Sequence, residues 1–98
     1  MFTITVTFTV KNEDVDRFRT LILNQAQDSL TKELACRVFD VAIGESKEGI
    51  VPFFLYELYD TESDFKAHLN STHFIDFNKV SAPYVVSKVV DAWERISS

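Results

Sequence analysis

Residues 2–10 carry the pattern that most constrains the fold of this chain, a strict alternation of apolar residues and threonines. The even positions hold large apolar residues and the odd positions hold threonines: Phe2, Ile4, Val6, Phe8 and Val10 against Thr3, Thr5, Thr7 and Thr9. Because successive side chains of a β-strand point to opposite faces, this alternation predicts a strand with one buried face. The second face is polar but uncharged.

The remaining periodicities predict an α+β domain. Apolar residues at helical spacing follow a capping Asn12, and short apolar runs bounded by polar turns predict further strands. The expected strands cover residues 36–43, 52–59 and 84–93, and the expected helices cover residues 13–31, a segment capped by Asp60 or Thr61, and residues 72–80, which Pro83 closes. The order β-α-β-β-α-β is typical of a ferredoxin-like, split βαβ topology, in which a four-stranded antiparallel sheet carries its helices on one face.

The composition narrows the class of protein. The 98 residues suffice for one domain, residues 1–98, and a hydrophobic content of 46% is typical of a compact globular chain. A net charge of −5 without a basic cluster argues against a nucleic-acid partner or an anionic membrane. The single Cys36 forms no intrachain disulfide, and residues 1–10 lack the continuous apolar run of a signal peptide. We therefore expect a cytoplasmic protein with no membrane partner.

A sheet that is covered by helices on one side leaves its other side to be explained. Charged residues should dominate that side if it were ordinary surface, but the first strand offers threonines and the third offers Phe54, Tyr56 and Leu58 or their alternates. Uncharged faces of this size usually mark association between chains. We therefore expect a homodimer whose sheets stack face to face.

The segment 53–77 combines an aromatic strand that carries one acid with a helix that carries one histidine. Period-two alternation places Glu57 on the same strand face as Phe53 and Tyr59. A carboxylate on such an apolar face needs a partner, because a buried unpaired charge is costly or stays protonated. His68, about one short helix later, is the expected partner. A Glu–His pair in an apolar pocket could move protons on a small organic substrate.

These residues resemble the antibiotic biosynthesis monooxygenase (ABM) family, a group of dimeric α+β barrels with ferredoxin-like topology. The resemblance runs over nearly the whole chain and is carried by Asn24 with Ser29, the strand Cys36–Val41, the strand Leu55–Tyr59 with Glu57, and the run His68–Phe74. It is nearest to the branch that includes quinol monooxygenases and the enzyme that processes phosphorylated autoinducer-2. One difference is the turn at residues 33–36, which lacks the family's usual glycine, so we expect a different turn at the pocket mouth.

The resemblance implies oxygenation without a metal, flavin or other cofactor. Such chemistry needs an electron-rich substrate, a base, and an apolar pocket that admits dioxygen and excludes water. His68, whose unperturbed pKa is ~6.5, would be the base, Glu57 would orient or tune it, and Asn24 would hydrogen-bond a substrate oxygen. The candidate substrate-binding residues are Phe39, Phe53, Tyr56, Tyr59, Phe65 and His73.

Structural roles are the alternatives for the same residues. Glu57 could pair with a Lys or Arg across the sheet, Asn24 could face solvent, and His73 could cap a helix. Cys36 has no basic cluster nearby and is expected to be a buried, unreactive thiol. His68 and His73 are five residues apart, off the i,i+4 spacing that places two ligands on one helical face, so we expect no metal site.

Three functions remain open on this basis. The first is a cofactor-independent monooxygenase that acts on a quinol or another small hydroxylated aromatic molecule. The second is an isomerase of a small phosphorylated carbonyl compound, such as phospho-autoinducer-2, although Arg37 is the main basic candidate near the pocket and this slightly disfavours a phosphate. The third is a dimer that binds a small ligand without catalysis. A pocket filled by side chains would favour the third function, and a ring-sized cavity that reaches His68 would favour either enzyme.

Overall fold

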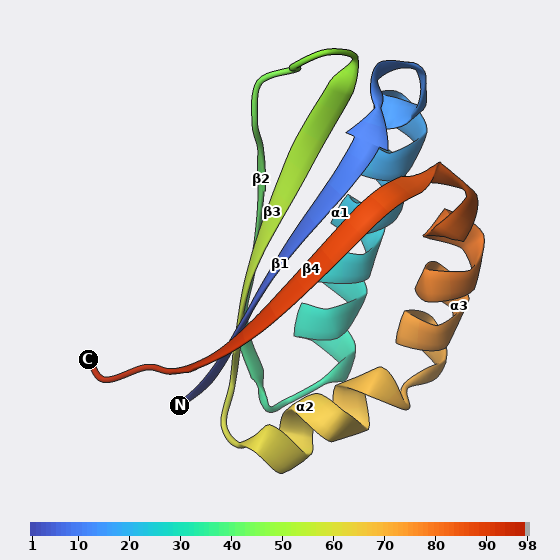
Figure 1. Cartoon of the computed structure of the whole chain (residues 1–98). Helices are drawn as coiled ribbons and strands as arrows, with labels where there is room; N and C mark the ends of the chain where they lie inside the picture. The colour runs from blue at the N-terminus through green and yellow to red at the C-terminus, as the bar shows by residue number, and fades with distance from the viewer. Residues whose placement is uncertain (98) are drawn as a thin grey trace.

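The computed structural model describes residues 1–97 and confirms the predicted α+β fold (Figure 1). Over these residues the elements are β1 (Phe2–Lys11), α1 (Val15–Lys32), β2 (Cys36–Ile43), β3 (Ile50–Tyr59), α2 (Glu62–Leu69), α3 (Thr72–Ser81) and β4 (Val85–Glu94). Single turns of 3₁₀-helix at residues 12–14 and 82–84 precede α1 and β4. The predicted order of strands and helices is therefore the observed one, with small differences at the ends of the elements.

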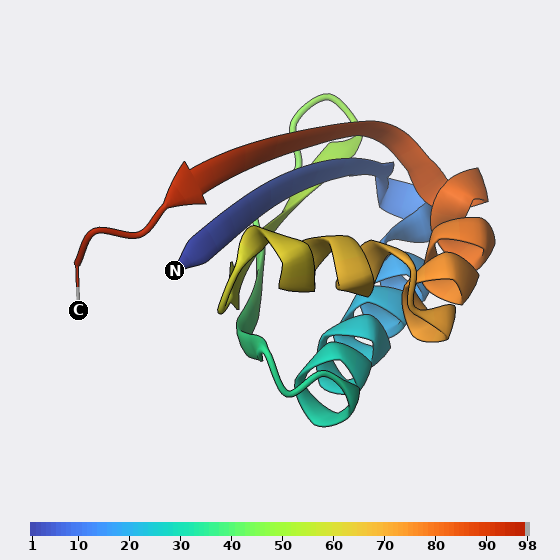
Figure 2. The ribbon, with the colours of Figure 1, turned by 90° about the horizontal axis from the view of Figure 1, so that it is seen from below.

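The four strands form one antiparallel sheet in the order β2-β3-β1-β4, with the helices on one face (Figures 1 and 2). The register places Glu57 of β3 beside Ile4 of β1 on one side and beside Phe39 of β2 on the other. On the opposite edge of β1, Lys88 of β4 pairs with Phe8. All five side chains therefore lie on the helix-covered face, because paired residues in neighbouring strands point the same way.

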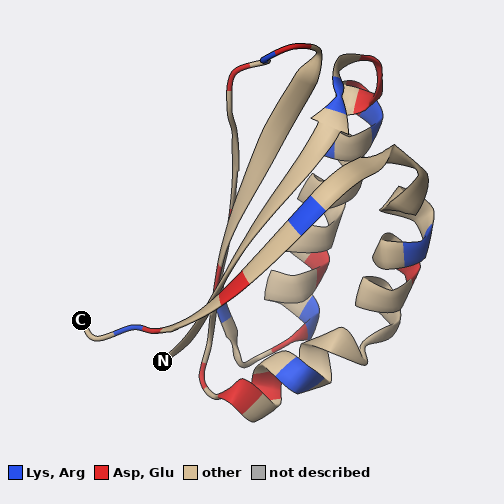
Figure 3. Cartoon of the chain, viewed as in Figure 1, with Lys and Arg blue, Asp and Glu red and all other residues tan. Residues whose placement is uncertain are grey.

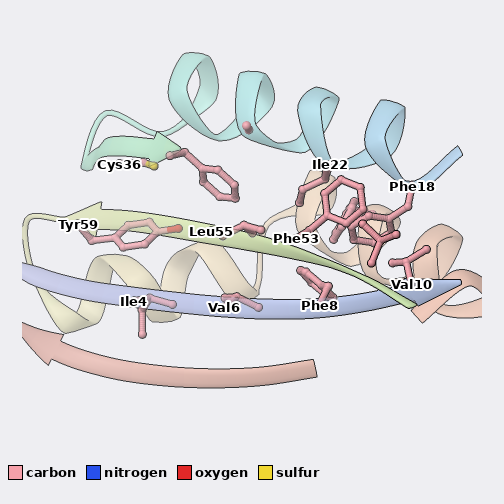
Figure 4. Close-up of a cluster of buried hydrophobic side chains, with 14 residues drawn as sticks. Ile4, Val6, Phe8, Val10, Phe18, Ile22, Cys36, Phe53, Leu55 and Tyr59 are labelled. Carbon is pink, nitrogen blue, oxygen red and sulfur yellow. The ribbon is translucent and has the colours of Figure 1, made fainter. Parts of the chain in front are cut away.

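The hydrophobic core lies between this face and α1 (Figure 4). The apolar residues of β1 from Ile4 to Val10 are buried, as the alternation predicted. Phe18 is fully buried, and its ring centroid lies 4.9 Å from that of Phe53 and 5.1 Å from that of Phe8. Aromatic pairs at these distances contribute beyond the area that they bury, and this cluster fixes α1 over the middle of the sheet.

Two caps set the directions of the short helices. Thr61 caps α2 in a capping box, in which its hydroxyl accepts from the backbone N–H of Asp64 and its own backbone N–H donates to the Asp64 carboxylate. Ser71 caps α3, since its hydroxyl accepts from the backbone N–H of Phe74. The chain bends between the two helices (Figure 2), which brings the imidazoles of His68 and His73 to a centroid separation of 5.9 Å.

The other face of the sheet has no helix over it among the described residues. Most residues that the register places on this face are uncharged, although Asp40 of β2 and Asp91 of β4 also lie on it, and the helices carry many charged residues (Figure 3). Phe54, Val89 and Trp93 lie on this face about half exposed, and the Trp93 indole N–H donates to Thr5 at 2.9 Å. We call it the open face. Every residue of β4 from Val86 to Glu94 is exposed, although this strand also borders the core side. No helix within residues 1–97 is long and apolar enough to cross a membrane.

Candidate active site

A cavity of about 210 Å³ lies between the helices and the helix-covered face of the sheet. Most of its lining is apolar, from residues Ile4, Val6, Phe8, Ile22, Phe39, Leu55, Phe65, Leu69, Phe74, Phe77 and Val90. Four lining residues are polar: Gln25, Glu57, His68 and Lys88. A cavity that is mostly apolar with a few convergent polar groups is the usual form of a small-molecule site.

Glu57 is a buried acid in this wall. Its register on β3 turns the side chain toward the helices, and the residue is only 3% exposed. The hydroxyl of Tyr59 donates to its Oε1 atom at 2.7 Å. Burial raises the pKa of Glu57 to about 7, despite the opposing effects of the Tyr59 hydrogen bond and the positive charge of Lys88. The carboxyl group therefore changes its protonation state near neutral pH.

His68 faces Glu57 from α2. Its ring lies among the rings of Phe65, at a centroid distance of 6.1 Å, and Phe74, at 5.0 Å, and the residue is 2% exposed. The His68 Nε2 atom lies 4.0 Å from Oε1 of Glu57, which is longer than a hydrogen bond. Burial lowers the pKa of His68 below its usual value, and the neighbouring Glu33 opposes this change. The imidazole is therefore mainly neutral at pH 7 and can accept a proton.

Glu33 is a residue of the site that the sequence did not single out. It follows α1, and its Oε2 atom lies 2.8 Å from Nδ1 of His68 and 2.5 Å from Nε2 of His73. Its own backbone N–H donates to the carbonyl of Ser29 at 3.1 Å, which holds the turn. The turn needs no glycine, since Leu34 adopts a negative φ. The only sequence signal was that this turn differs from the family pattern, which did not indicate a carboxylate beside His68.

The Glu33 carboxylate shows how the ring of His68 is held. If Nδ1 carries the proton and donates to Glu33, Nε2 is left unprotonated and directed toward Glu57. This is the arrangement of a general base whose other nitrogen is oriented by a carboxylate. The site therefore combines an oriented imidazole, His68, with a carboxyl group whose pKa is near neutral, Glu57.

Within residues 1–97, Glu33, His68 and His73 are close enough together to bind a metal ion. One possible ligand atom from each lies within 4.8 Å of the others. The two histidines come from different helices, so the i,i+4 spacing rule that argued against them as joint ligands does not apply. Two imidazoles and a carboxylate are a donor set that suits Zn²⁺ or Fe²⁺. The Oε2 atom of the Glu33 carboxylate also lies within hydrogen-bond distance of both rings, which holds the three side chains together.

Lys88 lies at the β4 side of the cavity. The residue is exposed as a whole, but its ammonium lies 5.4 Å from the centroid of the Phe8 ring and 5.6 Å from that of Phe74. Desolvation between these rings lowers the pKa of Lys88, and the negative charge of Glu57 opposes this. The cavity thus carries a cation that the sequence did not single out.

The structure brings some of the predicted residues to the cavity. Glu57, His68, Phe39 and Phe65 line it. Tyr59 is fully buried behind Glu57, which it contacts through its hydroxyl. Together these residues connect β2, β3 and α2 around one space.

Other predicted residues lie elsewhere. Asn24 is exposed in a second, more open groove between α1 and α3, which His73 also lines, and the neighbouring Gln25 reaches the cavity instead, because consecutive helical residues point about 100° apart. Phe53 lies in the core against Phe18 rather than in the cavity wall.

Tyr56 and His73 also stand apart from the cavity. Tyr56 is on the open face, since it is one residue from Glu57 in a strand. His73 contacts Glu33 and Ser71 and does not line the cavity. Arg37, the basic residue expected near the pocket, pairs with Asp60 at 2.8 Å at the surface.

Comparison with known proteins supports the fold. A family model described as "Antibiotic biosynthesis monooxygenase" matches residues 1–80. A candidate antibiotic biosynthesis monooxygenase from Nitrosomonas europaea superposes with a TM-score of 0.88 at 20% identity, over 99% of this chain and 100% of that chain. A similar protein from Caulobacter crescentus superposes with a TM-score of 0.88 at 18% identity, over 98% of this chain and 90% of that chain. One from Deinococcus radiodurans superposes with a TM-score of 0.86 at 20% identity, over 100% of this chain and 95% of that chain. At these identities the likeness shows the fold alone. No curated protein matches this chain significantly.

Proposed function

This chain belongs to the antibiotic biosynthesis monooxygenase family, and we propose that it oxygenates a small quinol or related hydroxylated aromatic compound without a bound cofactor. One observation carries the proposal. The buried imidazole of His68, held at Nδ1 by Glu33, directs its free nitrogen into an apolar cavity of about 210 Å³. A positioned neutral base in such a cavity suits the removal of a proton from a phenolic hydroxyl.

The proposed reaction balances without an outside reductant. A quinol and dioxygen give a hydroxyquinone and water, so that one oxygen atom enters the ring and the other leaves in water. His68 takes the hydroxyl proton, and the resulting phenolate supplies electrons to dioxygen as the new carbon–oxygen bond forms. The oxygen–oxygen bond then breaks as the second oxygen leaves with protons, and the carbons are oxidised to the quinone level.

Glu57 is suited to the second proton transfer. Its pKa of about 7 leaves part of the population protonated at neutral pH, and the Tyr59 hydroxyl fixes the carboxyl group. The acid and the base thus have opposite roles, with His68 accepting a proton first and Glu57 donating one later. Gln25, from α1, offers an amide to a substrate oxygen in the place proposed for Asn24.

The isomerase alternative uses the same pair of groups. Proton transfer beside a carbonyl also needs a base and a hydrogen-bond donor, which His68 and Glu57 or Gln25 provide. A phosphorylated substrate has less support, because Arg37 is paired with Asp60 outside the cavity. A purely ligand-binding protein would not need a base held by a carboxylate.

Oxygen uptake tests the proposal directly. The purified protein is given hydroquinone or a substituted quinol in an oxygen electrode cell, with and without catalase. Incorporation of label from ¹⁸O₂ into the product supports oxygenation. Return of half the oxygen on addition of catalase would indicate a quinol oxidase that makes hydrogen peroxide. His68→Ala should abolish the uptake. The rate of His73→Ala shows whether the neighbouring imidazole also takes part. No uptake with any quinol, together with turnover of a carbonyl compound, would favour the isomerase.

A further inference from the structure

We infer that Lys88 forms an anion subsite in the cavity, so that the ligand is a single-ring compound that carries one carboxylate as well as its hydroxyl groups. The hydroxylated ring rests on the proposed function, whereas the carboxylate is argued from Lys88 alone. The inference therefore narrows the substrate class from quinols in general to acidic quinols.

The position of the ammonium is the first observation. Lys88 pairs with Phe8 in the sheet, which turns its side chain to the helix-covered face, and the group lies over the rings of Phe8 and Phe74. Within residues 1–97 no carboxylate oxygen lies within the 4.0 Å that defines an ion pair with this ammonium. A partly desolvated ammonium that lies over two aromatic rings and has no close counter-charge favours an anion that enters the same space.

The charges around Lys88 select the kind of anion. Glu57 lies in the same cavity and attracts Lys88, but burial keeps part of the Glu57 population neutral near pH 7. A carboxylate brings one negative charge, which one ammonium can balance. A phosphate dianion would bring a second negative charge next to Glu57, while among residues 1–97 Lys88 is the one Lys or Arg that lines the cavity.

The cavity size limits the rest of the ligand. A cavity of about 150 Å³ accommodates benzene, so a cavity of about 210 Å³ fits one ring with a few substituents. His68 and Lys88 line the same space from α2 and β4. A compound with hydroxyls near the imidazole and a carboxylate near the ammonium would use both polar groups.

Binding of a matched pair of probes tests the inference. Titration calorimetry at pH 7 compares 2,5-dihydroxybenzoate with its uncharged amide, 2,5-dihydroxybenzamide, and measures binding without turnover. We expect the acid to bind about 10-fold more tightly than the amide, the effect of one charge-assisted contact. In Lys88→Met this ratio should fall to about 1. Lys79→Met, which removes an exposed lysine of α3, should keep the ratio.

The outcomes separate the possibilities. Equal affinity of the wild-type protein for acid and amide would overturn the inference, and so would an unchanged ratio in Lys88→Met when thermal unfolding shows that this variant is folded. Tighter binding of phenyl phosphate than of benzoate would overturn the assignment to a carboxylate. If the acid binds through Lys88 but no quinol is oxygenated, the subsite stands and the proposed reaction fails.

Discussion

The Nδ1 atom of His68 lies 2.8 Å from Oε2 of Glu33, while Nε2 of the same ring faces Glu57 at 4.0 Å. One imidazole therefore connects a carboxylate near the surface to a carboxyl group in the cavity. The first contact orients the ring and favours a proton on Nδ1, and in the proposed reaction the second nitrogen is the one that takes the substrate proton. The proposed function gives the two acids separate tasks, although they flank the same side chain.

Removing the orienting carboxylate should change both the rate and its pH dependence. We predict that Glu33→Gln lowers kcat/KM about 10- to 100-fold, the range seen when a metal-bound histidine loses the carboxylate or carbonyl that orients it. Glu33 raises the pKa of His68, so the acid limb of the pH–rate profile should move to lower pH. Glu62→Gln, at an exposed acid of α2, is the control. A lower rate with an unmoved acid limb would contradict the positioning role.

His68 and Glu57 should act as a unit in turnover. His68→Ala and Glu57→Gln are each expected to reduce kcat strongly, and the double variant should lose little more than the worse single one. The measurement is oxygen uptake per folded molecule, with the folded fraction taken from thermal unfolding. If both variants only lower the melting temperature and keep turnover per folded molecule, the two residues are structural.

Glu57 should also give the stability of the protein a distinctive pH dependence. Its pKa is about 7 in the folded protein against 4.5 unfolded, so the folded state holds the extra proton between these values. The stabilisation is fully present below about pH 4.5 and is lost as the pH rises through 7. The opposite pKa shift of His68, which is lowered by burial, destabilises the protein as the pH falls below about 6.5.

Comparison of the wild type with Glu57→Gln isolates the contribution of the Glu57 carboxyl group to the pH dependence of the free energy of unfolding. The groups that act on Glu57 are Tyr59 on its own strand, Lys88 on β4 and Glu33 after α1, with His68 opposite on α2, and all of them remain in the variant. The free energy of unfolding of the variant, relative to the wild type, should rise by about 2–3 kcal/mol between pH 5 and pH 8. A constant difference in urea unfolding at the two pH values would show that Glu57 does not titrate in this range.

Cys36 should be unreactive in the native protein. The thiol is buried, and desolvation together with the charges of Glu33 and Glu57 raises its pKa to about 12. Because the thiolate is the reactive form, iodoacetamide at pH 8 should leave Cys36 unmodified in buffer and alkylate it in urea. Mass spectrometry gives the extent of modification. Rapid alkylation in buffer would show that the strand end around Cys36 opens readily.

The open face should hold a homodimer together. Val89 is 55% exposed on this face, opposite Thr7 in the sheet. We predict a dimer at micromolar concentration in sedimentation velocity, and dissociation in Val89→Lys, because a charge in the middle of an apolar contact is costly to bury. Ile75→Lys, at a residue of α3 that is 52% exposed, should leave the dimer intact. A monomeric wild-type protein would refute the sheet-to-sheet arrangement.

The elements of the fold followed from local patterns. The alternation of β1 and the caps at Thr61 and Ser71 depend on residues that are close in sequence, and these signals survive in the structure. The burial of Glu57 and His68 followed from the same periodicities. Asn24 shows the limit of this reasoning, because one position along a helix decides whether an amide faces the cavity or solvent.

The contacts of the site could not be read from the sequence. The Glu33–His68 hydrogen bond joins residues 35 positions apart, and it depends on the turn after α1 and the bend after α2 meeting in space. Tyr59, rather than His68, is the hydrogen-bond partner of Glu57. The two residues lie two positions apart on one face of β3, so the Tyr59 hydroxyl is nearer to the carboxyl group than the His68 ring on the facing helix is. Lys88 gave no signal because a single lysine in a strand is usually exposed.

The exposed strand β4 has a consequence for how this protein can change. It supplies Lys88 and Val90 to the cavity wall, yet its residues from Val86 to Glu94 lie outside the buried core. Substitutions at such positions usually alter the free energy of unfolding by little, whereas changes in the core are costly. Under the proposed function, ligand preference can thus diverge through Lys88 and Val90 while the fold and His68 stay constant, so that these two positions of β4 are the natural place for selection, or an engineer, to retune the substrate.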